Sequence, residues 1–209
     1  MYHTSKNIKN SKIFLGFFSK NNGFSKNNYT SLNCSYSSGD KVDYVTKNID
    51  IAKKAINLED KSLKIINQIH SRNVFLIKQN DLNNKFQGDG LITQDKKISL
   101  AILTADCCPI FLFDNNATFI ACLHVGWKGC YLNIIENALI KIKKIQPKVE
   151  SISAIIGPHL GKNNFEVEEE FKKKFIQKSN KYNKFFNNSK KQNKYLFDMG
   201  GVNFISTNR

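Results

Sequence analysis

The stretch PIFLFDNNATFIACLHV, residues 109–125, decides how we interpret the fold. Two runs rich in branched and aromatic residues, 109–113 and 118–123, flank the polar turn Asp114-Asn115-Asn116-Ala117. Runs of this length and composition favour β-strands, and Asn tolerates the positive φ that a short loop demands. The stretch therefore predicts an antiparallel hairpin.

The hairpin also predicts which residues face one another. If Asn115 and Asn116 form a two-residue loop, residues whose numbers sum to 231 are partners, and a four-residue loop over 114–117 gives the same pairs. Cys107 then lies opposite His124, with Cβ atoms about 4.5–5.5 Å apart on one face. A thiolate and an imidazole at that distance can hold one metal ion or share one proton.

Two kinds of chemistry suit such a pair. Catalytic zinc takes three protein ligands, Cys and His among them, and keeps one position open. Alternatively, His124 activates Cys107 as a nucleophile, which would make a metal-free hydrolase. A third metal ligand could come from His70 or His159, and the spacing does not choose between them. Asp106 is a candidate to orient a ligand histidine from outside the metal's own shell.

Other segments supply further strands and helices. The apolar spacing predicts helices over 45–58 and 132–142, and strands over 74–77, 98–103 and 151–156. A polar helix should begin near Glu166, and residues 178–194, dense in Lys and Asn, should form a solvated surface segment. The first 40 residues should hold strands and turns. Strands interleaved with helices predict one α+β domain over residues 1–209, with mixed β-sheet layers flanked by helices.

The sequence Gly126-Trp127-Lys128-Gly129 directly precedes one of these helices. Free backbone amides at a helix N-terminus, together with the Lys128 ammonium, would suit a phosphate group. Lys128 is therefore a candidate for substrate binding.

Composition limits the partners and the location. Lys and Arg number 32 against 17 Asp and Glu, a net charge of +15. Only two of the basic residues are Arg, and 27 Asn accompany 30 Lys, a pattern that A/T-rich codons explain without a nucleic-acid partner. No apolar run approaches the ~18–20 residues of a membrane span, and the N-terminus lacks a signal-peptide pattern. We expect a cytoplasmic protein, monomeric or homodimeric, that binds neither nucleic acid nor membranes.

Several motifs resemble those of the multicopper polyphenol oxidase, or laccase-domain, family. Residues 104–109 (TADCCP) and 124–129 (HVGWKG) resemble its T-A-D-C-x-P and H-x-G-W-R-G motifs, with Lys128 in place of Arg. Further matches are 29–33 (YTSLN), 67–70 (NQIH), 89–93 (DGLIT), 157–158 (GP) and 165–167 (FEV). The resemblance covers about residues 14–200, and we expect a domain that lacks the family's C-terminal segment.

The resemblance implies a function and a set of site residues. Bacterial members are described as purine nucleoside phosphorylases and as peptidoglycan editing factors. The implied activity is phosphorolysis of adenosine, inosine and methylthioadenosine to base and sugar 1-phosphate, with adenosine deamination alongside. The alternatives to it are the metal-free Cys–His hydrolase and a cytoplasmic editing factor for peptidoglycan precursors.

The same resemblance implies a zinc site, with copper as the less favoured metal. Its ligands would be His70, Cys107 and His124. The expected catalytic residues are Cys107, His124 and Asp106, and the expected substrate contacts come from Lys128, Asn33 and Gln68. The partners would be purine nucleosides and phosphate.

Overall fold

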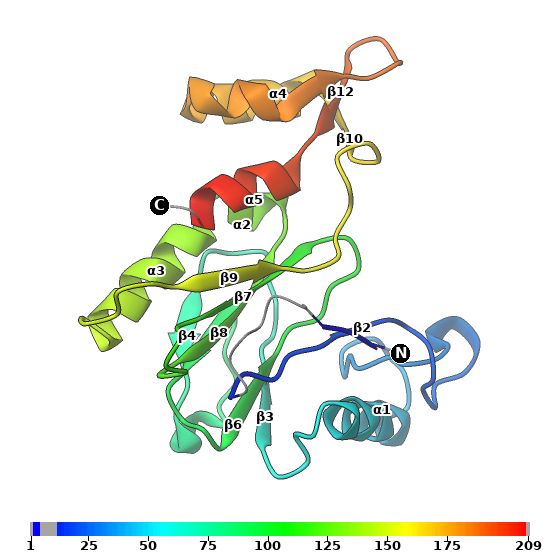
Figure 1. Ribbon diagram of the computed structural model, residues 1–209. Helices are drawn as coiled ribbons and strands as arrows, with labels where there is room; N and C mark the ends of the chain where they lie inside the picture. Colours follow the sequence, from blue (N-terminus) through cyan, green and yellow to red (C-terminus); the bar gives the residue numbers. More distant parts are fainter. Residues whose placement is uncertain (1, 5–11, 208–209) are drawn as a thin grey trace.

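A five-stranded sheet lies at the centre of the computed structural model, which describes residues 2–4 and 12–207 (Figure 1). In spatial order its strands are β4 (Val74–Leu76), β5 (Gly90–Thr93), β8 (Ile120–Val125), β7 (Cys108–Phe113) and β9 (Ser153–Ile156). β4 and β5 are parallel, and the other neighbours are antiparallel. These strands lie within three residues of the predicted bounds wherever a strand was predicted.

The predicted hairpin is β7–β8, but its register differs from the prediction. Partners sum to 233 rather than 231, so that Pro109 and not Cys107 lies opposite His124. The loop extends over residues 114–119 because the Asp114 carboxylate accepts hydrogen bonds from the Thr118 backbone N–H at 2.7 Å and hydroxyl at 3.0 Å. A shift of two residues leaves every side chain on its predicted face, and residue 107 therefore keeps the parity that it shares with His124.

Helices cover one face of this sheet. α3 (Ile134–Ile145) packs on β4, β5 and β8, and α5 (Met199–Thr207) packs on α3 and on the short helix α2 (Trp127–Tyr131). α3 buries Ile135, Ala138 and Ile142 of the apolar stripe that its spacing predicted, and Ile134 in addition, whereas Leu132 of that stripe lies before the helix and is exposed. Asn133 adopts a left-handed conformation, φ 61°, and separates α2 from α3. The helix predicted over 45–58 is α1 (Val42–Ala55), which lies at the opposite end of the molecule (Figure 1).

Three smaller sheets complete the fold. β3 (Ser62–Ile65) pairs in parallel with β6 (Ile98–Ala101), and β1 (Tyr2–His3) pairs with β2 (Phe17–Phe18). β10 (Glu166–Glu168), β12 (Lys194–Phe197) and β11 (Phe186–Asn188) form an antiparallel sheet. With α4 (Glu169–Lys178), this sheet makes a layer beyond α5 (Figure 1). The 3-10 helices are η1 (Asn27–Tyr29), η2 (Gln79–Asp81) and η3 (Asn180–Phe185). The arrangement confirms the predicted α+β class.

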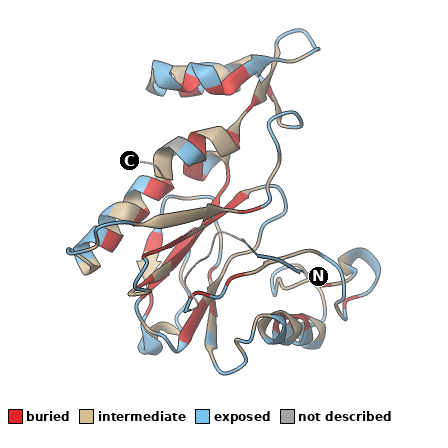
Figure 2. Ribbon diagram, viewed as in Figure 1, coloured by how far each residue is buried: buried red, intermediate tan, exposed pale blue. Residues whose placement is uncertain are grey.

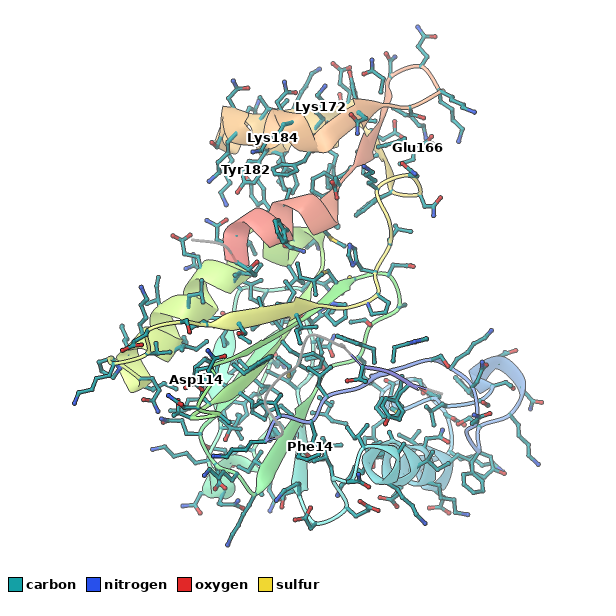
Figure 3. All side chains as sticks on the ribbon, viewed as in Figure 1. Phe14, Asp114, Glu166, Lys172, Tyr182 and Lys184 are labelled. Carbon is teal, nitrogen blue, oxygen red and sulfur yellow. The ribbon has the colours of Figure 1, made fainter. Side chains whose placement is uncertain are left out.

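Of two predictions about the layer formed by α4 and β10–β12, one holds to within three residues and the other is wrong in part. The helix predicted near Glu166 begins at Glu169, because residues 166–168 pair with β12 instead. The segment 178–194 is not wholly solvated, since it buries three aromatic side chains, Tyr182, Phe185 and Phe186. The rings of Tyr182 and Phe186 pack against the fully buried ring of Phe175. Figure 3 shows Tyr182 between α4 and α5, and Figure 2 marks buried positions on both helices.

The central sheet separates the two larger of the three apolar clusters that form the core. Ile110, Leu112 and Leu123 face α3 in the larger cluster, together with Cys108. Leu91 and Cys122 face the other way and pack with Ile66, Ile77 and Ile98. Both cysteines are fully buried free thiols in the core, a common place for a free cysteine.

A buried lysine fixes the loop around η2. The Lys64 side chain in β3 is almost inaccessible to solvent, and its ammonium donates to the backbone carbonyls of Asp81, Leu82 and Asn84 at 2.5–2.8 Å. A buried charge requires such partners, and the loop is therefore bound to β3.

None of the helices in the described part of the chain has the length and hydrophobicity that a membrane span needs.

Candidate metal centre

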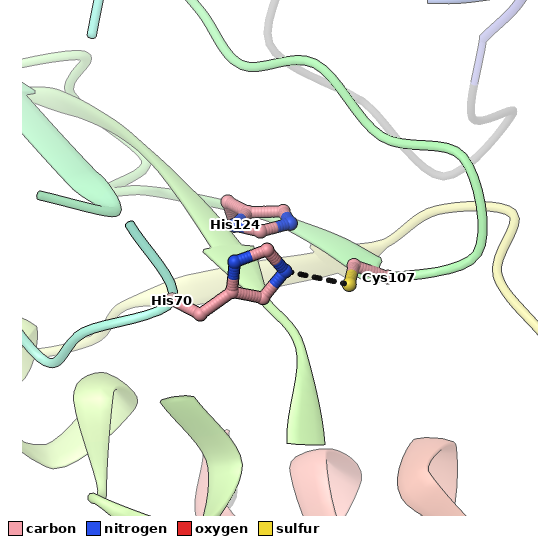
Figure 4. A group of neighbouring side chains, drawn as sticks. All are labelled: His70, Cys107 and His124. Carbon is pink, nitrogen blue, oxygen red and sulfur yellow. Dashed lines mark hydrogen bonds between the residues drawn. The ribbon is translucent and has the colours of Figure 1, made fainter. Parts of the chain in front are cut away.

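Three side chains of the kind that bind metals meet at one end of the central sheet (Figure 4). His124 lies in β8, Cys107 directly precedes β7, and His70 comes from the segment between β3 and β4. The Cys107 Sγ lies 3.8 Å from the His70 Nε2, and one ligand atom of each residue lies within 4.8 Å of the others. Donor atoms of a tetrahedral zinc site lie about 3.4–3.6 Å apart, so these side chains need to approach one another by about 1.4 Å at most to share an ion.

The backbone around His70 is held in an unusual conformation. His70 has φ 57°, in the left-handed region where histidine is one of the enriched side chains. Two residues earlier, the Gln68 amide both donates to and accepts from the Leu103 backbone, each time at 2.7 Å. This pair of bonds connects the His70 segment to the segment that leads into Cys107. The contact between Gln68 and substrate stays a prediction.

A carboxylate that the sequence analysis gave no role, Asp89, holds His124. Asp89 is fully buried, and its Oδ1 lies 2.8 Å from the His124 Nδ1. The β5–β8 pairing brings the two residues together, since the His124 backbone N–H also donates to the Asp89 carbonyl at 2.7 Å. We expected Asp106 to orient a ligand histidine; its side chain is exposed, and Asp89 occupies that position instead. The sequence signal that could have pointed to Asp89 was its place as an acidic residue directly before the apolar strand β5.

Charge in the centre is coupled through this contact. Burial alone would lower the pKa of the His124 imidazole. The hydrogen bonds to Asp89 and Cys107 outweigh this effect and raise the pKa to about 9. Burial alone would raise the pKa of the Asp89 carboxyl. The hydrogen bonds from His124, Ser71 and the His70 backbone outweigh this effect, and the pKa lies below its usual value. In the metal-free protein the pair is therefore an ion pair at neutral pH.

Gly126 lies against the other two members of the group. A Cβ atom at this position would be 2.9 Å from the Cys107 Sγ and 3.0 Å from the His70 Cδ2. Both contacts are shorter than van der Waals distance. Glycine at residue 126 is therefore what allows the thiol and the imidazole to come together in front of β8.

The remaining predicted residues lie outside this group. Lys128 is exposed, with its ammonium 5.7 Å from the centre of the Trp127 ring, and α2 is only five residues long. Asn33 uses its side chain within its own turn, donating to Ser38 and Asp40. Substrate contacts from Lys128 and Asn33 stay predictions.

His159 is the histidine that the spacing left open as a third ligand. Its Nδ1 lies 2.8 Å from the Gly157 carbonyl, and its ring packs beside Gly200 at the start of α5. Within the described residues it is not part of the His70–Cys107–His124 group. The geometry therefore favours His70 over His159.

Comparisons with known proteins agree with this architecture. The chain is 33% identical over 165 residues to a purine nucleoside phosphorylase of Rickettsia conorii. The matched region covers 75% of this chain and 68% of the relative. It is 33% identical over 157 residues to a purine nucleoside phosphorylase of Bacteroides thetaiotaomicron, which covers 71% of this chain but only 58% of the relative. The solved structure of the YfiH protein of Bacillus licheniformis has the same fold, with a TM-score of 0.82 at 23% identity over 92% of this chain and 75% of that one.

A family model extends the comparison over nearly the whole described chain. It is described as multi-copper polyphenol oxidoreductase laccase, and it matches residues 14–207. All three members of the candidate metal centre lie inside this range. The chain therefore belongs to the multi-copper polyphenol oxidoreductase laccase family.

Proposed function

We propose that this chain is a zinc-dependent purine nucleoside phosphorylase that acts in the cytoplasm. Its substrates would be adenosine, inosine or methylthioadenosine together with phosphate, and its products the free base and the sugar 1-phosphate. The names of relatives at 33% identity support the reaction class. The observation that carries the proposal is the convergence of two imidazoles and one thiol, within 4.8 Å of one another, beside Gly126.

The donor set fits zinc. Two nitrogen ligands and one sulfur ligand leave a fourth tetrahedral position open, as in catalytic zinc sites. One thiol and two imidazoles do not provide ligands for several copper centres, although a single copper ion would accept the same donors. When bound, zinc would supply a positive charge that acidifies and polarises the group in the open position.

The chain's own residues would bind the substrates and transfer the proton. In phosphorolysis a phosphate oxygen forms a bond to the anomeric carbon while the glycosidic carbon–nitrogen bond breaks, and the base leaves with the electron pair and takes up a proton. We assign phosphate binding to the exposed ammonium of Lys128 and nucleoside contacts to Asn33 and Gln68. The exposed carboxyl of Asp106, next to Cys107, is our candidate for the group that delivers the proton.

The test combines metal analysis with product analysis. Purified protein incubated with adenosine and phosphate should release adenine and ribose 1-phosphate, and should contain about one zinc per chain. Cys107→Ser should lose both the zinc and the activity. Cys34→Ser is the matched control, because Cys34 is also a free, partly exposed cysteine but lies outside the group, and it should keep both.

Other outcomes would contradict the proposal in distinct ways. A zinc-loaded protein that releases no base from any of the three nucleosides would exclude phosphorolysis. Activity that survives chelation but is lost on thiol alkylation would favour the metal-free Cys–His hydrolase. The additional deaminase activity is tested separately, in phosphate-free buffer, by the conversion of adenosine to inosine.

A further inference from the structure

The carboxylate of Asp89 contacts both histidine segments of the candidate metal centre. Its Oδ1 accepts from the His124 Nδ1 at 2.8 Å and from the His70 backbone N–H at 3.0 Å. Its Oδ2 accepts from the Ser71 backbone N–H at 2.5 Å and from the Ser71 hydroxyl at 2.8 Å, with the Ile69 N–H at 3.4 Å. One fully buried carboxylate thus collects donors from two segments that are more than fifty residues apart in the sequence.

The contact with His124 fixes which ring nitrogen is free. Because Asp89 only accepts hydrogen bonds, the His124 Nδ1 must carry the proton. The lone pair of the neutral ring is then on Nε2. A carboxylate that holds a histidine in this way sets the ring orientation and raises the basicity of the ligand nitrogen.

The contact with residues 69–71 acts on the backbone. His70 adopts φ 57°, which is costly for a side chain other than glycine. The backbone N–H groups of Ile69, His70 and Ser71 all point to the Asp89 carboxylate. Because these bonds form in the conformation that aims the His70 ring at Cys107, they offset its cost.

We propose that Asp89 is the positioning residue of this centre: it aligns His124 through the ring and His70 through the backbone, so that both can bind one divalent metal ion with Cys107. The inference rests on the proposed metal site. It adds that the affinity for the metal depends on a residue that is not itself a ligand.

Asp89→Asn is a sharp test because asparagine has nearly the same shape. In either orientation, the side-chain amide places an NH₂ group against donors: against His124 and the His70 N–H, or against the two donors of Ser71. We expect the dissociation constant for Co²⁺ or Zn²⁺, measured by chelator competition, to rise about 10- to 100-fold. The matched control is Asp106→Asn, which neutralises an exposed aspartate directly beside Cys107. This substitution should change the metal dissociation constant less than about threefold.

Two spectroscopic measurements separate positioning from a general loss of stability. The Co²⁺ form of folded Asp89→Asn should show altered ligand-field bands, whereas Asp106→Asn should match the wild type. In the wild-type protein, the His124 Nδ1–H should give a slowly exchanging, downfield proton resonance, identified by its absence from His124→Gln. This second measurement needs no Asp89 variant to fold.

The outcomes are distinguishable from failure of the proposed function. Unchanged metal affinity in Asp89→Asn, or a wild-type protein without the protected ring proton, would overturn the positioning role. Tight metal binding that weakens in Asp89→Asn would support the inference even if no nucleoside is cleaved. A wild-type protein that binds neither metal would refute both the centre and its positioning residue.

Discussion

The substitution Gly126→Ala tests the geometry of the metal centre without removing any of its ligands. Gly126 has φ −74° and ψ 173°, a conformation that alanine adopts freely. The added methyl group therefore acts only through its neighbours. Its carbon would lie 2.9 Å from the Cys107 Sγ and 3.0 Å from the His70 Cδ2.

The size of the effect follows from these two distances. Non-bonded heavy atoms are comfortable at about 3.5–4.0 Å, so the thiol must retreat by about 0.6–1.1 Å. Metal–ligand distances tolerate only about ±0.2 Å. We expect the zinc affinity of Gly126→Ala to fall at least about 10-fold, the lower end of what displaced ligands cost. The metal-free protein should change in stability by less than about 1 kcal/mol, because alanine for glycine mainly reduces the entropy of the unfolded chain.

Two measurements on each variant are sufficient. Chelator competition gives the zinc affinity, and urea unfolding without metal gives the free energy of unfolding. Gly129→Ala is the matched control, since its Cβ would have only ordinary contacts, 3.4 Å or more, in the short helix that Gly126 directly precedes. If Gly126→Ala binds zinc as the wild type does, or if its metal-free form loses several kcal/mol, the steric reasoning is wrong.

Three further expectations follow from the structure. Phe175→Ala removes a fully buried ring packed between α4 and α5 and should lower the free energy of unfolding by about 3–5 kcal/mol in urea titrations; an unchanged midpoint would contradict the packing. Removing the metal should speed alkylation of Cys107 by iodoacetamide, detected by peptide mass analysis, and equal rates with and without zinc would argue against its being a ligand. The raised pKa of His124 stabilises the metal-free protein fully below about pH 6.5, and this stabilisation should be lost as the pH rises through about 9; a His124→Gln variant with the same pH dependence of unfolding would exclude this source.

Local patterns were sufficient for much of the fold. The stripe of α3 and the runs that became β7, β8 and β9 were all readable because their periodicity depends only on residues close in sequence. The hairpin register was not readable, since it depends on the hydrogen bonds of Asp114 to Thr118, which lengthen the loop. Lysine and asparagine around Tyr182 and Phe186 likewise concealed that these rings pack on α4.

The candidate site was readable only in part, for the same reason. Cys107 and His124 belong to one hairpin, so parity alone placed them on one side. His70 was chosen through the family resemblance and not through spacing. Asp89 reaches His124 through the β5–β8 pairing, which joins segments far apart in the sequence, and so its place before an apolar strand did not indicate which residue it holds.

Because the buried ammonium of Lys64 binds the loop around η2, the accessibility of that loop to a protease depends on whether β3 stays in place. The carbonyls of residues 81, 82 and 84 are tied to β3, which pairs with β6 outside the central sheet. If β3 detaches, the loop loses these anchors while the five-stranded sheet remains intact. Cleavage there by a protease would thus report opening of the small parallel sheet, at denaturant concentrations too low to unfold the whole chain.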